Sequence, residues 1–329
     1  MDSHVKYAHL YTVAVEKDAR GERKARRLTS GSFHVRSFDW SPDGRTIVFD
    51  HQSNPTADVW PTTDISHVPA DSGSVTSLVA WKGADTNPRY SPDGKLIAFE
   101  SDGGDSRWAR HGDLYVIPAS GGEPRKLAET QDRNFGLFDW AGDGKEVYVT
   151  ETDRISVRVY AVPLGGGKPR VVATGIGTYS GPALSKDGTT ISFIHQTTEV
   201  APDVYISGTR KFDPKKLSDV NADFPKLSMG RTEVITWKSK DGLDMEGLLT
   251  YPIGYEKGKR YPLVLRIHGG PAGVFIQSLP LKVLSIQSRL LLRRATLFCV
   301  PIRGEAPAMA WISGLQTSMI GGLVTMRMI

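Results

Sequence analysis

The chain has 329 residues, of which 39% are hydrophobic and 23% charged, a composition typical of folded globular proteins and not of disordered ones. Its formal net charge is +5, and residues 276–329 alone hold six basic residues and one acidic residue. The other 275 residues therefore carry balanced charge, which argues against a nucleic-acid partner. There is one cysteine and no apolar run of about 18 residues, which excludes an intrachain disulfide framework and a transmembrane helix.

The first ten residues, MDSHVKYAHL, carry charged side chains and lack the apolar stretch of a secretory signal. As written, the sequence predicts a cytoplasmic chain, although a longer parent protein could be exported. The eight histidines show no HExxH or H-x-H spacing. We therefore expect no metal site and no cofactor.

Four segments align without gaps around an Asp-Gly pair. Their glycines are spaced by 50, 50 and 44 residues. The segments are FDWSPDGRTIVFD (38–50), RYSPDGKLIAFE (89–100), FDWAGDGKEVYVT (138–150) and ALSKDGTTISFI (183–194). Asp-Gly between apolar stretches predicts a tight hairpin turn, and the alternating apolar residues after it predict a half-buried strand.

Further strand patterns follow these hairpins, at 113–119, 158–164 and 203–208. Units of four strands at a period of 40–50 residues predict the blades of a β-propeller with WD40-like repeats. At most five blades can be counted in residues 1–228, including a partial one built from 9–18 and 23–31. The first and last pieces could also close one blade together. The propeller is therefore expected to be incomplete, with the chain starting inside it.

Some conspicuous residues in this region are assigned to the scaffold. Asp43 and Asp93 are expected to serve only their turns, and Ser180 is interpreted as a turn residue. Trp40 and Trp140 recur at one blade position, which predicts packing between blades. The polar loop DGGDSRWARHGD (102–113) is expected to be solvated, although in a complete enzyme it could touch a peptide terminus.

A different pattern begins near residue 229. Residues 231–252 predict two strands joined by a turn at Lys240-Asp241-Gly242, and Pro262–His268 reads as a buried strand of an α/β sheet. This strand ends in His268-Gly269-Gly270-Pro271. Glycines at such a strand end let backbone N–H groups approach a developing oxyanion, as in α/β-hydrolases.

The chain resembles the prolyl oligopeptidase family of serine peptidases (family S9), most closely its acylaminoacyl-peptidase and dipeptidyl-peptidase-like members. The resemblance lies in the order of three features: the SPDG repeats, then EVITWKSKDGLDMEGLLTYP, then YPLVLRIHGGPAGVF. The resemblance covers residues 9–275. It implies a propeller that restricts entry to an α/β-hydrolase domain with a Ser-Asp-His triad, acting on peptides. It also assigns His268, Gly269, Gly270 and Pro271 to the oxyanion-side loop.

The remaining family residues are absent from this chain. It contains no G-x-S-x-G motif and no histidine after His268, so a triad in the family's chain order cannot be assembled. We therefore expect a truncated, inactive part of a peptidase: 1–228 propeller, 229–275 start of the hydrolase domain. The alternatives are a Tol-system-like propeller that binds other proteins and, with less support, an esterase with an unusual nucleophile.

The family pattern stops after Phe275. Residues 276–329 contain one acidic residue and show no steady period of 2 or 3.6. We interpret them as a non-family tail that is expected to lack regular structure, produced by a shift of reading frame near residues 274–276. The alternative is a basic amphipathic segment for a membrane surface or a partner, supported by Leu290-Leu291-Leu292 beside Arg293-Arg294.

Overall fold

The computed structural model describes residues 6–104, 112–131, 135–222, 230–267, 274–279, 296–300, 317–320 and 323–326. In this part of the chain nearly all regular structure is β, with one short 3₁₀ helix, η1 (Ala57–Thr62). The chain divides into two compact units. The first comprises Met1–Val149, Tyr160–Val171 and Leu184–Thr189, and the second Thr150–Val159, Val172–Ala183 and Thr190–Ile329.

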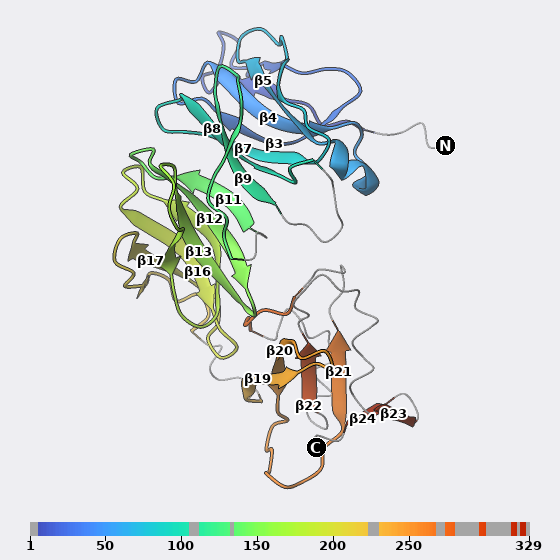
Figure 1. The fold of residues 1–329 in the computed structure, drawn as a ribbon. Helices are drawn as coiled ribbons and strands as arrows, with labels where there is room; N and C mark the ends of the chain where they lie inside the picture. Colours follow the sequence, from blue (N-terminus) through green and yellow to red (C-terminus); the bar gives the residue numbers. More distant parts are fainter. Residues whose placement is uncertain are drawn as a thin grey trace. The chain divides into compact units, whose positions relative to one another are not determined.

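Four four-stranded sheets follow one another along the chain, each with its strands in sequence order (Figure 1). The first sheet is β3 (His34–Trp40), β4 (Thr46–Gln52), β5 (Asp64–Pro69) and β6 (Thr76–Val79); the second is β7 (Asp85–Tyr90), β8 (Leu96–Ser101), β9 (Asp113–Pro118) and β10 (Arg125–Lys126); the third is β11 (Phe135–Trp140), β12 (Glu146–Asp153), β13 (Ser156–Pro163) and β14 (Arg170–Ala173); the fourth is β15 (Thr178–Leu184), β16 (Thr190–Gln196), β17 (Asp203–Gly208) and β18 (Lys215–Lys216). This succession confirms the predicted propeller-like region.

Each Asp-Gly pair forms the turn between the first two strands of its sheet. In the first turn the Asp43 carboxylate accepts hydrogen bonds from Ser41 Oγ at 2.6 Å and from the Arg45 backbone N–H at 3.0 Å. Gly44 has φ +69°, and the corresponding glycines have φ +71°, +68° and +67°. Only glycine adopts this left-handed conformation without a steric cost, which explains the repeat at this position.

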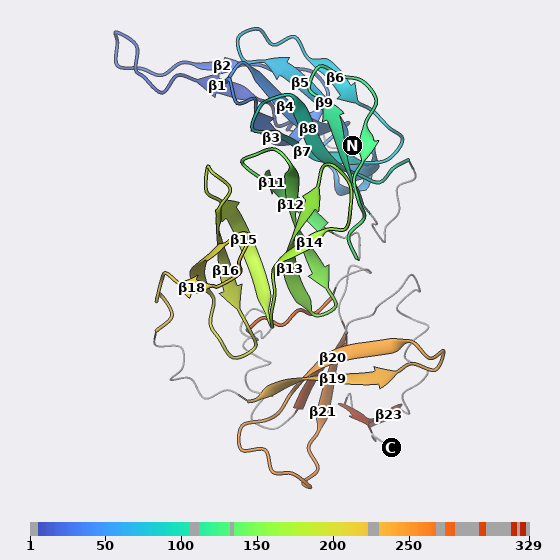
Figure 2. The ribbon, with the colours of Figure 1, turned by 60° about the vertical axis from the view of Figure 1, so that its left-hand side comes forward.

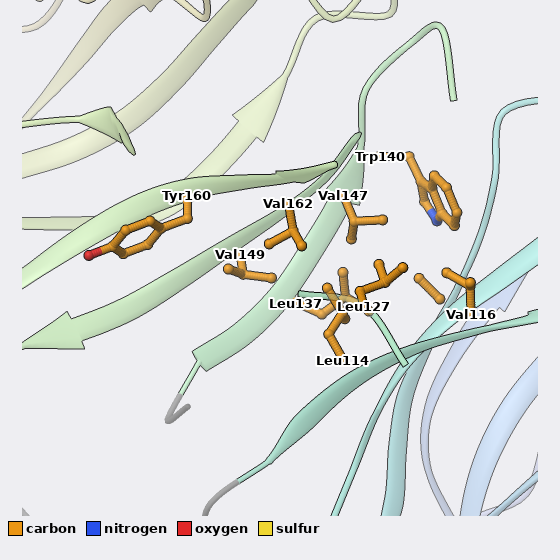
Figure 3. Packing of buried hydrophobic residues seen from close by; sticks show 10 residues of the cluster. Leu114, Val116, Leu127, Leu137, Trp140, Val147, Val149, Tyr160 and Val162 are labelled. Carbon is orange, nitrogen blue, oxygen red and sulfur yellow. The ribbon is translucent and has the colours of Figure 1, made fainter. Parts of the chain in front are cut away.

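Apolar side chains from neighbouring sheets of the first unit interlock. Leu114 and Val116 of the second sheet pack with Leu137, Val147 and Val149 of the third (Figure 3). The side chain of Trp140 joins this cluster with only 3% of its surface exposed. The prediction of packing between blades is correct for Trp140 but wrong for Trp40, which is 42% exposed.

The first sheet in the described part of the chain is two-stranded, with β1 (Tyr11–Val13) and β2 (Ala25–Arg27), and lies beside the first four-stranded sheet (Figure 2). It is the predicted partial blade. The fourth sheet has four strands of its own, so the first and last pieces do not share a blade in the described residues. Ser180 lies inside β15 on an exposed position, so it is a strand residue and not a turn residue.

A separate four-stranded sheet occupies the C-terminal part of the second unit. Its order is β19 (Thr232–Lys238), β20 (Asp244–Thr250), β22 (Thr296–Val300) and β21 (Leu263–Ile267). The predicted hairpin around Gly242 is therefore present, and the strand predicted at 262–268 is found at Leu263–Ile267. The expectation that 276–329 lacks regular structure is wrong, because β22 lies between β20 and β21, and β23 (Thr317–Ile320) pairs with β24 (Leu323–Met326).

Candidate functional site

The carboxyl end of β21 is the place where the sequence predicts the oxyanion-side loop. β21 runs parallel to β22 with a register from Leu263↔Thr296 to Ile267↔Val300. Parallel pairing brings the carboxyl ends of both strands to one edge of the sheet, and ligands of α/β sheets bind outside that edge. His268, Gly269, Gly270 and Pro271 follow directly on Ile267, and all four lie outside the described residues.

The next segment that the structure describes is 274–279, in which Gln277 is held by several hydrogen bonds. Its backbone N–H donates to the Ile155 carbonyl at 2.6 Å. Its buried side-chain Oε1 accepts the Gly177 backbone N–H at 3.0 Å and the Ser156 hydroxyl at 3.3 Å. The segment that follows the predicted oxyanion-side loop is therefore fixed at residue 277 to backbone and side chains of the second unit.

The turn between β12 and β13 supplies the partner surface for this segment. Arg154, at φ +56°, forms an ion pair with Glu246 of β20 at 2.5 Å. Ile155 packs in an apolar cluster with Leu248 of β20 and with Phe275. Sequence reasoning missed these contacts, because the short TDRIS stretch signals a turn but gives no sign of which distant residues it meets.

Three carboxyl groups of the propeller-like sheets have a raised pKa. Burial raises the pKa of Asp85 to about 6. Burial also raises the pKa of Asp39 and of Asp139, and the nearby Arg89 partly opposes the change in both. These carboxylates lie on the first strands of three successive sheets, far in sequence from the predicted loop, and burial accounts for their perturbation without a catalytic role.

The described histidines serve packing and local hydrogen bonds. His195 Nδ1 lies 3.1 Å from the Thr178 carbonyl, and its ring stacks on Tyr179. Burial lowers the pKa of His51, His67 and His195. Among the residues that the structure describes, no three His, Cys, Asp or Glu side chains gather as a metal site would require.

A pocket of about 480 Å³ opens beside the first two Asp-Gly turns, lined by Asp43, Asp93, His67 and Tyr90 among others. The two carboxylates accept hydrogen bonds from Ser41 and Ser91 within their own turns. These hydrogen bonds lower the pKa of both aspartates. Both carboxylates thus have local structural partners.

In the loop 102–113, Asp102 is half-buried, while Asp105, Arg107 and Arg110 lie outside the described range.

No known family profile matches the chain. In sequence it is 26% identical over 250 residues to dipeptidyl-peptidase 5 of Porphyromonas gingivalis, an alignment covering 74% of this chain and 36% of that protein. It is 29% identical over 262 residues to dipeptidyl-peptidase 5 of Aspergillus oryzae, covering 73% and 35%. The chain thus spans about a third of the length of these relatives.

Solved structures show the same fold. The acylaminoacyl peptidase of Pyrococcus horikoshii superposes with a TM-score of 0.61 at 18% identity, over 86% of this chain and 42% of that one. A prolyl endopeptidase structure gives a TM-score of 0.63 at 13% identity, over 92% and 44%. In the described part of the chain, no helix is both long and apolar enough to span a bilayer.

Proposed function

We propose that this chain, a relative of the serine peptidases of the prolyl oligopeptidase family, is the part of such an enzyme that combines gating blades with the first strands of its catalytic domain. The observation that carries the proposal is the sequence similarity to two dipeptidyl-peptidases 5 over nearly three quarters of the chain. The complete enzyme would hydrolyse peptides, and the propeller would limit access to short ones.

The arrangement of the C-terminal sheet supports this assignment. β21 is followed directly by HGGP in the sequence, and its parallel neighbour β22 ends at the same edge of the sheet. In acyl-transfer enzymes, backbone N–H groups at such an edge stabilise the oxyanion of the tetrahedral intermediate. We assign this role to the loop His268–Pro271, with the glycines allowing the substrate carbonyl to approach.

This chain by itself is proposed to be catalytically incomplete. A serine nucleophile needs a base that takes its proton and a third group that orients the base. The sequence holds no G-x-S-x-G elbow and no histidine beyond residue 268. Binding of a peptide without turnover is the most that the predicted loop could contribute.

Activity-based labelling tests this proposal. The purified chain is incubated with a fluorophosphonate probe and, separately, with dipeptidyl and N-acetylaminoacyl p-nitroanilides, beside full-length dipeptidyl-peptidase 5 of Porphyromonas gingivalis as positive control. We expect labelling and turnover for the control only. Labelling of any serine of this chain would contradict the missing nucleophile.

The alternative, a module that binds another protein through its blades, makes a different prediction. It requires a stoichiometric complex with a defined partner, seen by co-purification of the whole chain and confirmed with purified components.

For residues 276–329 we propose a shifted reading frame. If neither of the other two frames downstream of codon 275 encodes a continuation with G-x-S-x-G, that proposal is wrong.

A further inference from the structure

The two-stranded sheet β1–β2 corresponds to the outer half of a blade. The Leu28 backbone N–H donates to the Leu10 carbonyl at 2.9 Å, so Leu10 faces Leu28. In the first complete sheet Ile65 of β5 faces Val79 of β6 in the same way. Leu10 and Leu28 are buried against Ile47, Phe49 and Val68 of that sheet. β1 and β2 thus take the places of third and fourth strands.

The inner edge of β1 is open in the described residues. In an antiparallel pair, hydrogen-bonded and non-hydrogen-bonded residue pairs alternate. Because Leu10 bonds to Leu28, the N–H and C=O groups of Tyr11 and Val13 point away from β2. At the same place in the complete sheet, β5 pairs with the whole of β4 along this edge. An unpaired strand edge next to apolar residues is a template for another strand.

The exposure of Trp40, in the neighbouring four-stranded sheet, points to the same open edge. Trp40, Tyr90 and Trp140 occupy one repeat position at the end of the first strand of their sheets. Tyr90 is 8% exposed and clusters with Val48 of the preceding sheet, and Trp140 is 3% exposed and clusters with Ala98 of its preceding sheet. Trp40 is 42% exposed. The described residues hold only the third and fourth strands of the blade before it, and not the second strand that carries the covering residue in the complete sheets.

We propose that the open edge of β1 together with the exposed face of Trp40 is a binding surface for a β-hairpin of the chain's own repeat type. The occupant is two strands joined by an Asp-Gly turn, with a small or β-branched residue where Val48 and Ala98 stand. Its second strand pairs with β1 through backbone hydrogen bonds, as in β-strand addition. Its apolar side chain covers Trp40. This inference rests on the repeat geometry and not on the peptidase assignment.

The chain itself supplies the probe for a test. In the first sheet, residues 53–63 connect β4 to β5, a link of eleven residues. For the test, a second copy of residues 34–55 is fused in front of Met1. The link between the added hairpin and His9 then consists of residues 53–55 of the copy and residues 1–8 of the chain, which is again eleven residues. His9 corresponds to Asp64 in the repeat. The added hairpin can therefore reach β1 in phase, with the whole natural chain retained.

Hydrogen exchange of residues 9–15 and acrylamide quenching of Trp40, isolated by difference from a Trp40→Phe variant, report on binding. We expect amide exchange to slow by about tenfold or more and quenching of Trp40 to fall. The matched control carries Val48→Asp in the added copy only and should show neither effect. A free peptide of residues 34–52, added to the unfused chain, checks the result without the fusion.

Two outcomes would overturn the inference. Unchanged exchange of residues 9–15 both in the fusion and with the peptide would show that β1 does not accept this hairpin. Concentration-dependent dimerisation of the unfused chain that protects the same amides, followed by light scattering, would assign the surface to a second copy of the chain instead.

Discussion

Asp85, at the start of β7, is completely buried, so its carboxyl group has no contact with solvent. Its two oxygens accept hydrogen bonds from the Ser101 hydroxyl at 2.6 Å and from the Trp81 backbone N–H at 3.0 Å. Burial nevertheless raises its pKa from 3.8 to about 6, and the nearby Asp64 and Asp102 add to the increase. Loss of hydration therefore outweighs the two hydrogen bonds for the ionised form.

This carboxyl group should make stability depend on pH. Between about pH 4 and 6 the folded chain binds more protons at Asp85 than the unfolded chain does, so its contribution to the unfolding free energy decreases as pH rises. The slope for one proton is at most about 1.4 kcal/mol per pH unit. Urea denaturation of the wild type and Asp85→Asn at pH 4, 5, 6 and 7 measures it. A stability difference that does not change in favour of Asp85→Asn as pH rises would contradict the assignment.

Between elements, two carboxylates at the same repeat position connect the first strands of successive sheets. Asp50 accepts hydrogen bonds from the backbone N–H of Ser37 at 2.8 Å, within its own sheet, and of Asn87 at 2.7 Å, in the next. Glu100 accepts from the Asn87 side-chain amide at 2.9 Å and from the Leu137 backbone N–H at 2.7 Å, again in the next sheet. Each carboxylate thus links the first strand of its own sheet to the first strand of the next.

Removing this link should destabilise the first unit. Glu100→Ala leaves the buried Leu137 N–H without its carboxylate acceptor, and we expect a loss of about 1–3 kcal/mol of unfolding free energy. Glu100→Gln keeps an acceptor oxygen and should lose less. Glu123→Ala, at an exposed loop position, is the control and should stay within about 0.5 kcal/mol of the wild type. Equal values for Glu100→Ala and Glu123→Ala in chemical denaturation would refute the link.

At the scale of the whole chain, the second unit joins segments that are 100 or more residues apart. Gln277 is central to this joining, because its Oε1 accepts the Gly177 N–H while its own N–H bonds to Ile155. These contacts, with the Arg154–Glu246 ion pair, hold the segment after the predicted oxyanion-side loop. Its position therefore depends on the turn between β12 and β13 and not on the C-terminal sheet alone.

Gln277→Ala should loosen this joining. The buried Gly177 N–H loses its acceptor, at a cost of about 1–3 kcal/mol, and the amide hydrogen of Gly177 should exchange faster. Gln277→Glu retains an acceptor oxygen and should protect Gly177 as the wild type does at neutral pH. Ser278→Ala, the adjacent half-buried position, serves as control. Native-state hydrogen exchange followed by mass spectrometry reads all three, and unchanged exchange at Gly177 in Gln277→Ala would be the contrary result.

Much of the fold could be predicted from the sequence because its signals are local. The Asp-Gly turns, the alternating strands after them and the hairpin around Gly242 follow from backbone preferences and period-two burial within a few residues. Predictions failed where a distant neighbour decides. Trp40 and Trp140 have the same local sequence, but only Trp140 has a preceding second strand to cover it. The flanking glycine predicts a turn at Ser180, but the residue lies in β15.

By itself the sequence determined the repeat, the change of pattern near residue 229, the HGGP strand end and the lack of a downstream triad, since each is a property of residue order. The tertiary structure alone decided that β22 lies between β20 and β21, that Gln277 meets Gly177, and that the edge of β1 is open. Pairing between distant segments depends on which backbone groups still lack hydrogen bonds, and which apolar faces are still exposed, after the local elements have formed. The sequence does not show which of these groups and faces meet, because that depends on how the elements pack in three dimensions.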